Sequence, residues 1–152
     1  MTSSVTRLWD QYRAINPNAP ADAPISFHFC DNQADADLCA SLVATGQKRA
    51  TAPSVAELEL AGDPIPRVGD YAIVTDWRGN AIAVIQTVSV EIKKFGDIDE
   101  EFARSEGEGD LTLEWWRAAH QAYYENVLTG SKYRVDDDLE IACESFEVAL
   151  KA

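Results

Sequence analysis

The sequence predicts an α+β domain built on a small, mostly antiparallel sheet with flanking helices. Stretches with the helical repeat are mixed with stretches of alternating β-branched residues, and the two kinds do not follow regular strand–helix–strand alternation. A chain of 152 residues with 46% hydrophobic residues is long enough to bury a substantial core. We therefore expect residues 1–152 to form a single domain, with 1–24 as an N-terminal helix and connector packed on it.

The N-terminal third predicts two helices separated by a short strand. Apolar residues recur with the helical repeat over 4–15, and three prolines follow that helix. Residues 25–29 alternate and predict a strand. Asp31 or Asn32 can cap a second helix, and Gly46 stands where a left-handed residue ends it.

The rest of the chain shows both periodicities, with glycine- and proline-rich stretches between the periodic ones. The predicted elements are an extended segment at 48–52, a helical turn at 57–60, strands 71–75 and 81–90 joined by a hairpin loop at 76–80, a strand end at 92–95, helices 99–105 and 112–127, and a last strand at 139–150.

The charge balance limits the partners that the protein can have. The net charge of −13 argues against tight, non-specific binding of duplex nucleic acid, because such binding needs a basic surface. A nucleoside or a short single strand is repelled much less. No apolar run is long enough to span a membrane, and the first residues do not resemble a signal peptide. We expect a cytoplasmic protein without a membrane partner.

The three cysteines are odd in number and lack a CxxC spacing. We therefore expect neither a disulfide framework nor a zinc site. Cys39 and Cys143 fall on apolar stretches and should be buried, which leaves Cys30 as the one to test for reactivity.

Lys48 and Thr51 are candidates for an activated nucleophile. A threonine hydroxyl is a weak nucleophile that needs a base or an electropositive neighbour, and burial can lower the pKa of a lysine enough to serve. The pair can cooperate only if the chain turns between them, since residues three apart on a regular strand point to opposite faces. The alternative is a surface lysine beside an ordinary strand threonine.

Glu106, Glu108 and Asp110 alternate with glycines, which lets the backbone turn so that carboxylates can converge. One carboxylate could act as a general acid or base, or Glu106 and Glu108 could bind a divalent metal ion. For Asp110 the favoured interpretation is a charge at the start of the 112–127 helix.

Aromatic residues supply candidate surfaces for stacking a base. Trp116 and His120 follow one face of the 112–127 helix, a pattern more typical of core than of a binding platform. Arg117 beside them could add a cation. Trp77 lies at a predicted hairpin tip, where a core role is harder to explain.

These motifs, in this order and spacing, resemble the ASCH domain family, whose domain has a PUA-like β-barrel fold. The resemblance covers roughly residues 8–150. It is carried by Leu42-Val43-x-x-Gly46-x-Lys48-x-x-Thr51-Ala52, Pro66-x-x-Gly69-Asp70, Ala83-Val84-Ile85, Phe95, Ala103-x-x-Glu106-Gly107-Glu108-Gly109-Asp110, Trp116-Arg117-x-x-His120 and Cys143-Glu144-x-Phe146. The run from Glu106 to Asp110 is similar to that of a longer branch of the family.

The resemblance implies a pocket for nucleic acid or its components. Small bacterial members hydrolyse the amide of N4-acetylcytidine with a lysine, a threonine and a glutamate, which correspond to Lys48, Thr51 and Glu106. Other members resemble RNA-binding modules, or are ribonucleases that in some cases depend on metal. Phe27-His28-Phe29-Cys30 departs from the usual Trp-x-Phe-Gly and alters one pocket wall, and Arg49 replaces a small residue beside the lysine.

Two functions follow from the resemblance. In the first, the protein is an amidohydrolase without a cofactor: Thr51 attacks the acyl carbon, Lys48 takes its proton and helps to hold the oxyanion, and Glu106 positions the lysine and protonates the leaving amine. Trp77 or Trp116 would stack on the base. In the second, the protein is an RNA-binding domain or a ribonuclease on single-stranded RNA, with a basic cleft around Lys48, Arg49 and Arg117. Glu106 and Glu108 would then hold a divalent metal. A third alternative is a nucleotide sensor without turnover.

Overall fold

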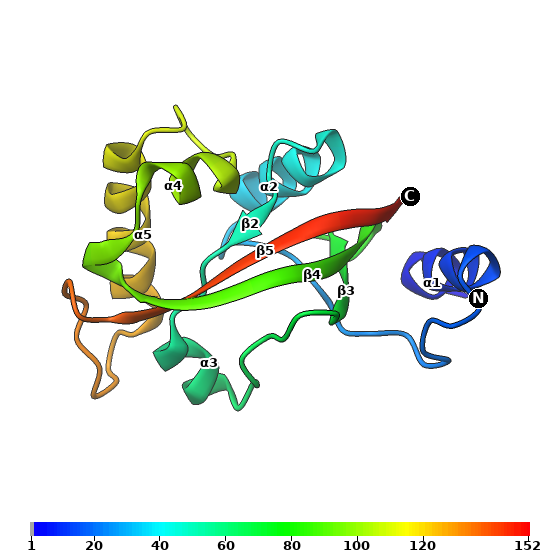
Figure 1. The fold of residues 1–152 in the computed structure, drawn as a ribbon, viewed down its shortest axis with the longest axis horizontal. Helices are drawn as coiled ribbons and strands as arrows, with labels where there is room; N and C mark the ends of the chain where they lie inside the picture. The colour runs from blue at the N-terminus through cyan, green and yellow to red at the C-terminus, as the bar shows by residue number, and fades with distance from the viewer. Residues whose placement is uncertain (1) are drawn as a thin grey trace.

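The structure, a computed structural model, describes residues 2–152, and Figure 1 shows how its helices and strands are arranged. The elements in this range are α1 (Ser4–Ile15), β1 (Ser26–Phe27), α2 (Gln33–Thr45), β2 (Ala50–Thr51), α3 (Val55–Ala61), β3 (Tyr71–Thr75), β4 (Ala81–Lys94), a short 3₁₀ turn (Phe95–Asp97), α4 (Glu100–Glu106), α5 (Leu113–Val127) and β5 (Glu140–Lys151).

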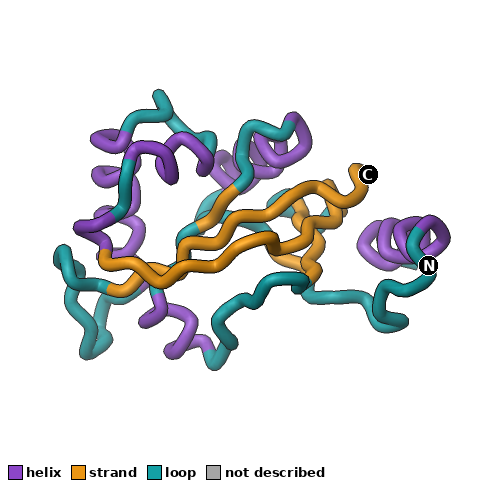
Figure 2. Tube along the Cα trace, in the orientation of Figure 1, coloured by secondary structure: helices purple, strands orange, loops and turns teal. Residues whose placement is uncertain are grey.

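The strands form one open, mostly antiparallel sheet in the order β1-β3-β4-β5-β2. The β1–β3 pair is parallel, and the other three pairs are antiparallel. The β4 and β5 strands form a long ribbon (Figure 2). Its register shifts at two places. Such shifts mark bulges, which bend and twist a ribbon. The α+β class and the mostly antiparallel sheet agree with the prediction.

Three elements differ in extent from the prediction. The strand predicted over 25–29 is only Ser26–Phe27, because the chain bends beyond it and Cys30 adopts a left-handed φ of 65°. The helical turn predicted at 57–60 is the longer α3, which begins early because Ser54 caps it. The strand segments predicted at 81–90 and 92–95 are the single strand β4, followed by the 3₁₀ turn.

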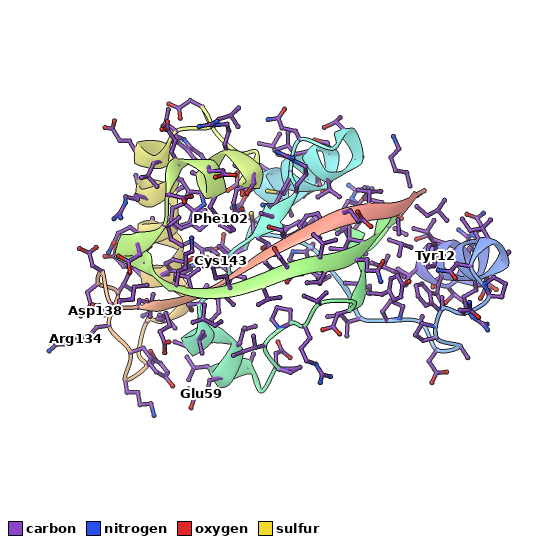
Figure 3. The ribbon with its side chains drawn as sticks, in the orientation of Figure 1. Tyr12, Glu59, Phe102, Arg134, Asp138 and Cys143 are labelled. Atoms are coloured by element: carbon purple, nitrogen blue, oxygen red, sulfur yellow. The ribbon has the colours of Figure 1, made fainter. Side chains whose placement is uncertain are left out.

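Three apolar clusters follow one another along the sheet. The first fills the space between β5 and helices α4 and α5 around Phe102 and Cys143, as Figure 3 shows. The second lies between α2 and strands β3 to β5, and the third holds α1 against β3 and β4. None of the helices within residues 2–152 combines the length and the apolar character needed to cross a membrane.

A glycine fixes the contact between α4 and the segment that leaves α2. Gly107 ends α4 with a φ of 75°, and a Cβ atom built on it would lie 2.5 Å from the Gln47 carbonyl oxygen. Only a residue without a side chain permits this approach, since real Cβ atoms do not come so close to backbone. The close approach brings the end of α4 against the backbone of Lys48.

This contact generates a stability prediction with a matched control. Gly62 ends α3 with a φ of 74°, but a Cβ there meets nothing within 4 Å. Gly62→Ala should cost only the left-handed penalty, about 1–2 kcal/mol. Gly107→Ala should cost about 1–3 kcal/mol more, because backbone must move. Urea unfolding of both variants measures the difference, and equal losses would contradict the proposed role of the contact.

Candidate functional site

Lys48 is a buried ammonium with a complete set of hydrogen-bond partners. Its side chain is 2% exposed and follows the left-handed end of α2 at Gly46. Its Nζ donates to Glu106 Oε2 at 2.5 Å, to Glu108 Oε2 at 2.9 Å and to the Ala50 carbonyl at 2.9 Å. An ammonium has three donors, so these partners satisfy it without water.

The alternation of acids and glycines explains how two carboxylates reach one lysine. Glu106 is the last residue of α4, and the left-handed Gly107 reverses the chain so that Glu108 returns to the same ammonium. Asp110 is exposed and accepts hydrogen bonds from Thr112, the cap of α5. The sequence interpretation of Asp110 as part of the helix start therefore agrees with the structure.

The carboxylates decide the protonation state of the lysine. Burial by itself would lower the pKa of Lys48, but the charges of Glu106 and Glu108 outweigh it and raise the pKa above its usual value. Burial would raise the pKa of Glu106, yet Lys48 and His120 hold it well below its usual range. Burial raises the pKa of Glu108, and the neighbouring Glu106 adds to this effect. The pKa shifts of Lys48 and Glu106 both favour a charged Lys48, opposite in direction to the sequence expectation that burial lowers its pKa.

His120 completes the cluster from α5, and sequence reasoning placed it in an aromatic band without a site role. Its Nδ1 lies 2.9 Å from the Trp116 carbonyl, which can only accept, so Nδ1 carries a proton. Its Nε2 lies 3.4 Å from Glu106 Oε1, an ion-pair contact. That oxygen is buried and has no hydrogen-bond partner among the described residues. The spacing of four residues from Trp116 is the signal that could have pointed to this role.

Thr51 lies on β2, at the edge of the sheet next to β5. Thr51 pairs with Glu144 across the antiparallel ladder, and directly paired side chains share a face. Phe146, two residues along β5, is therefore on that face as well. Phe29 stacks on Phe146 with ring centroids 6.5 Å apart, and Lys48 Nζ lies 4.9 Å from the centroid of Phe29. These contacts relate the ammonium to Phe146, whereas Ala52, the residue after Thr51, packs in the apolar cluster of α4 and α5.

The state of Thr51 differs from that of Lys48. The side chain is half-buried, and within residues 2–152 its hydroxyl makes no hydrogen bond. Lys48 bonds the carbonyl of Ala50, the residue directly before it. The structure therefore brings Lys48 and Glu106 into direct contact, and no hydrogen bond within residues 2–152 joins either of them to the Thr51 hydroxyl.

The predicted binding residues divide into exposed and occupied ones. Arg49 is exposed, and Trp77 is 39% exposed with its ring 4.7 Å from that of His28. Trp116 is buried, and its ring stacks on that of His120 with the centroids 4.0 Å apart. It therefore offers no exposed ring face on which a base could stack. The Arg117 guanidinium donates to the Gly96 carbonyl and faces Asp137. The cleft predicted around Lys48, Arg49 and Arg117 is not a continuous basic surface here.

Two cysteines adjoin the site. Cys39, on α2, donates from Sγ to Glu108 Oε1 at 3.4 Å, and Cys30 Sγ lies 3.7 Å from Cys39 Sγ. Sequence spacing did not predict this proximity, because it depends on the bend at Cys30. Cys39 and Cys143 are buried as expected, and burial raises the pKa of Cys143 to about 12.

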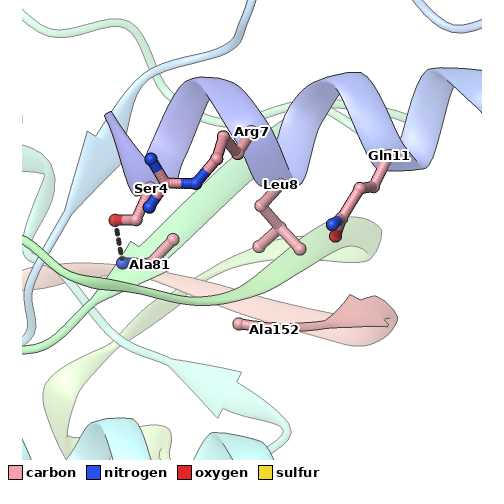
Figure 4. Close-up of a pocket in the computed structure, with 6 residues that line it drawn as sticks. All are labelled: Ser4, Arg7, Leu8, Gln11, Ala81 and Ala152. Atoms are coloured by element: carbon pink, nitrogen blue, oxygen red, sulfur yellow. Dashed lines mark hydrogen bonds between the residues drawn. The ribbon is translucent and has the colours of Figure 1, made fainter. Parts of the chain in front are cut away.

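Two shallow hollows on the surface lie away from this cluster. One, between α1 and the start of β4, is shown in Figure 4. It is lined by Ser4, Arg7, Leu8, Gln11, Ala81 and Ala152. The other lies between α3 and the segment that precedes β5. Neither contains a predicted site residue.

The fold agrees with the comparisons with known proteins. The family model of the ASCH domain matches residues 25–149, and the chain therefore belongs to the ASCH domain family. The crystal structure of an ASCH domain from Lactobacillus crispatus is similar, with 30% identity, a TM-score of 0.84, and coverage of 98% of this chain and 96% of that chain. A protein from Enterococcus faecalis has 27% identity, a TM-score of 0.86, and coverage of 95% and 87% respectively. No curated protein matches the chain.

We expect the free energy of unfolding to fall strongly when Lys48, the cation of this cluster, is replaced by a neutral residue. Lys48→Met should destabilise the fold by about 3–5 kcal/mol, because two carboxylates would remain buried without their partner. Lys94→Met is the matched control, since Lys94 is 59% exposed and faces an exposed Asp138. That variant should change stability by less than about 1 kcal/mol. Chemical unfolding measures both, and a small loss for Lys48→Met would contradict the account of the cluster.

The contact of His120 with the Glu106 carboxylate should make the stability of the fold depend on pH. Burial would lower its pKa, but the Glu106 carboxylate raises it above the usual value. The stabilisation should be complete below about pH 6.5, the ordinary value for an unfolded histidine, and should be lost as the pH rises through the higher folded-state value. Unfolding of the wild type and His120→Asn over this range tests it. A difference between them that stays constant with pH would contradict the assignment.

Proposed function

We propose that this ASCH domain is an amidohydrolase that cleaves an N4-acylated cytidine or a similar small amide of a nucleobase. The observation that supports it most is the buried ammonium of Lys48, bonded to two carboxylates, three residues before the unbonded hydroxyl of Thr51. A fixed cation and an unbonded hydroxyl supply parts that acyl transfer needs, a stabilised oxyanion and a nucleophile.

The proposed roles follow the charge states. Thr51 Oγ1 attacks the acyl carbon, and the Lys48 ammonium stabilises the resulting oxyanion. Glu108 is the accessible one of the two carboxylates, with a side chain 18% exposed against 2% for Glu106. The carbonyl oxygen of the substrate would replace Glu108 on the ammonium, and Glu106 would keep Lys48 in place.

The released Glu108 carboxylate takes the proton of Thr51 in this scheme. The C–N bond of the tetrahedral intermediate then breaks, and Glu108 returns the proton to the leaving amine. This forms cytidine and an acyl ester on Thr51. Water attacks the ester, gives its proton to Glu108, and the Thr51 oxygen regains a proton as the carboxylic acid leaves. The high pKa of Glu108 suits such a proton carrier, since general acids and bases work best near the operating pH.

The charge of the chain favours a nucleoside over an RNA strand. The net charge of −13 repels a polyanion, whereas a nucleoside carries no phosphate. ASCH domains have a PUA-like fold that is often linked to RNA binding, so an RNA strand is the second candidate. Its predicted basic residues are dispersed, since Arg117 is held by Gly96 and Asp137.

Thr51→Ala is the sharpest test of the proposal. The side chain is half-buried and makes no hydrogen bond, so its loss should leave the fold intact. Acetate release from N4-acetylcytidine, without added metal, should fall at least about 1,000-fold, as expected when a covalent nucleophile is removed. Glu108→Gln should lower kcat about 100-fold or more. Thr51→Ser should retain part of the activity.

Thr45→Ala is the matched control, because Thr45 is an exposed threonine bonded only to its own helix. It should match the wild type. Equal rates for Thr51→Ala and wild type, or no acetate release by the wild type, would overturn the proposal. If the same samples cleave or bind labelled single-stranded RNA, the second candidate function, action on an RNA strand, is favoured.

A further inference from the structure

We propose that Cys30 Sγ, Cys39 Sγ and Glu108 Oε1 form a binding site for a thiophilic divalent cation, with zinc as the expected ion. The proposal shares Glu108 with the amidohydrolase proposal, and a bound ion would hold the carboxylate that the proposed reaction releases, but it concerns binding and can be tested without turnover. It reverses the expectation from cysteine spacing, since the folded chain brings together two sulfur atoms that the sequence separates.

The distances between the three atoms match those of zinc ligands. Zinc in proteins is tetrahedral with Zn–S near 2.3 Å and Zn–O near 2.0–2.2 Å, which places two sulfur ligands about 3.8 Å apart and sulfur and oxygen ligands about 3.5 Å apart. The two sulfurs are 3.7 Å apart, and Cys39 Sγ is 3.4 Å from Glu108 Oε1. All three ligand atoms lie within 4.8 Å of one another.

Three separate parts of the fold hold these ligands in place. Cys39 is on the buried face of α2, and Glu108 follows the left-handed turn at Gly107. Cys30 has a φ of 65°, which is uncommon for a residue other than glycine. This unfavourable backbone conformation brings the Cys30 thiol close to that of Cys39. Backbone outliers of this kind cluster at functional sites.

The surrounding charges suit a divalent cation. Zinc would bind as both thiols release their protons, and Glu108 would keep its other oxygen on Lys48. Two thiolates and two carboxylates would then carry four negative charges against three positive charges on the metal and the ammonium, so the ion would not add an excess of positive charge. Cys30 and Glu108 are only half-buried, so a fourth position can take water.

A second group, Glu106, Glu108 and His120, also has ligand atoms within 4.8 Å of one another. This group is the weaker candidate, because Lys48 already bonds one oxygen of each carboxylate. A metal ion there would lie against the ammonium. Sulfur ligands further favour zinc over the harder magnesium or manganese ions.

Titration of the reduced wild-type protein with Co²⁺ tests the site, because cobalt replaces zinc and reports thiolate ligands by absorption. We expect one Co²⁺ per chain, intense thiolate-to-cobalt bands in the near ultraviolet, and loss of these bands when Zn²⁺ is added. About two protons should be released per ion. Zn²⁺ should also protect Cys30 from alkylation in the wild type, a readout that needs no variant.

Cys30→Ser and Cys39→Ser should each lose the bands, and Glu108→Gln should weaken binding at least about 10-fold. Cys143→Ser and His120→Asn are controls that should bind Co²⁺ as the wild type does. Cys143 lies in the first apolar cluster, and His120 belongs to the weaker candidate group with Glu106. Circular dichroism checks that each variant folds. No cobalt bands in the reduced wild type, or bands that survive in both Cys30→Ser and Cys39→Ser, would overturn the proposal.

Discussion

The structure depends on burying one lysine ammonium together with the groups that neutralise it. A charge in a protein interior is tolerated only when ion pairs and hydrogen bonds replace its water. Lys48 meets this condition through Glu106, Glu108 and the Ala50 carbonyl. Glu106 is supplied by the end of α4 and Glu108 by the turn at Gly107, and Phe29 and Cys39 of the second apolar cluster contact Lys48 and Glu108.

The same cluster shows why burial alone does not determine chemistry. Burial disfavours charge on a lysine and on a carboxylate alike, yet Lys48 and Glu106 both remain charged because each is the nearest counter-charge of the other. Glu108, the more exposed third member, is driven toward its neutral form. One burial environment thus yields a fixed cation, a fixed anion and a group that can exchange a proton.

Local signals in the sequence were enough for most of the fold and part of the site. The helical repeat over 4–15 and the prolines after it predict α1. Gly46 indicates the end of α2, and the predicted helix 112–127 begins at Thr112, the observed N-cap of α5. These signals suffice because each acts within a few residues. The glycines around Glu108 indicated converging carboxylates for the same reason. Family resemblance supplied the pairing of Lys48 with Glu106, which no local rule provides.

What the sequence could not predict depends on contacts between distant segments. The bend at Cys30 shortens β1 and turns a thiol toward α2, and no propensity rule favours a left-handed cysteine. His120 looked like one more aromatic residue of α5 until Glu106 approached it from α4. The sequence argument for the pKa of Lys48 rests on burial alone, whereas the folded chain adds the charges of Glu106 and Glu108.

The pairing of β2 has a consequence for how the chain matures during synthesis. β2 is two residues long and lies at the edge of the sheet, where its one strand partner is β5, the last strand of the sequence. A nascent polypeptide that has emerged through Thr51 must wait until β5, residues 140–151, has been synthesised before that partner exists. Contacts of such long sequence separation form late. A ribosome-bound intermediate that lacks β5 would therefore leave Thr51 on an unpaired segment, and the proposed nucleophile could not be aligned before that strand emerged.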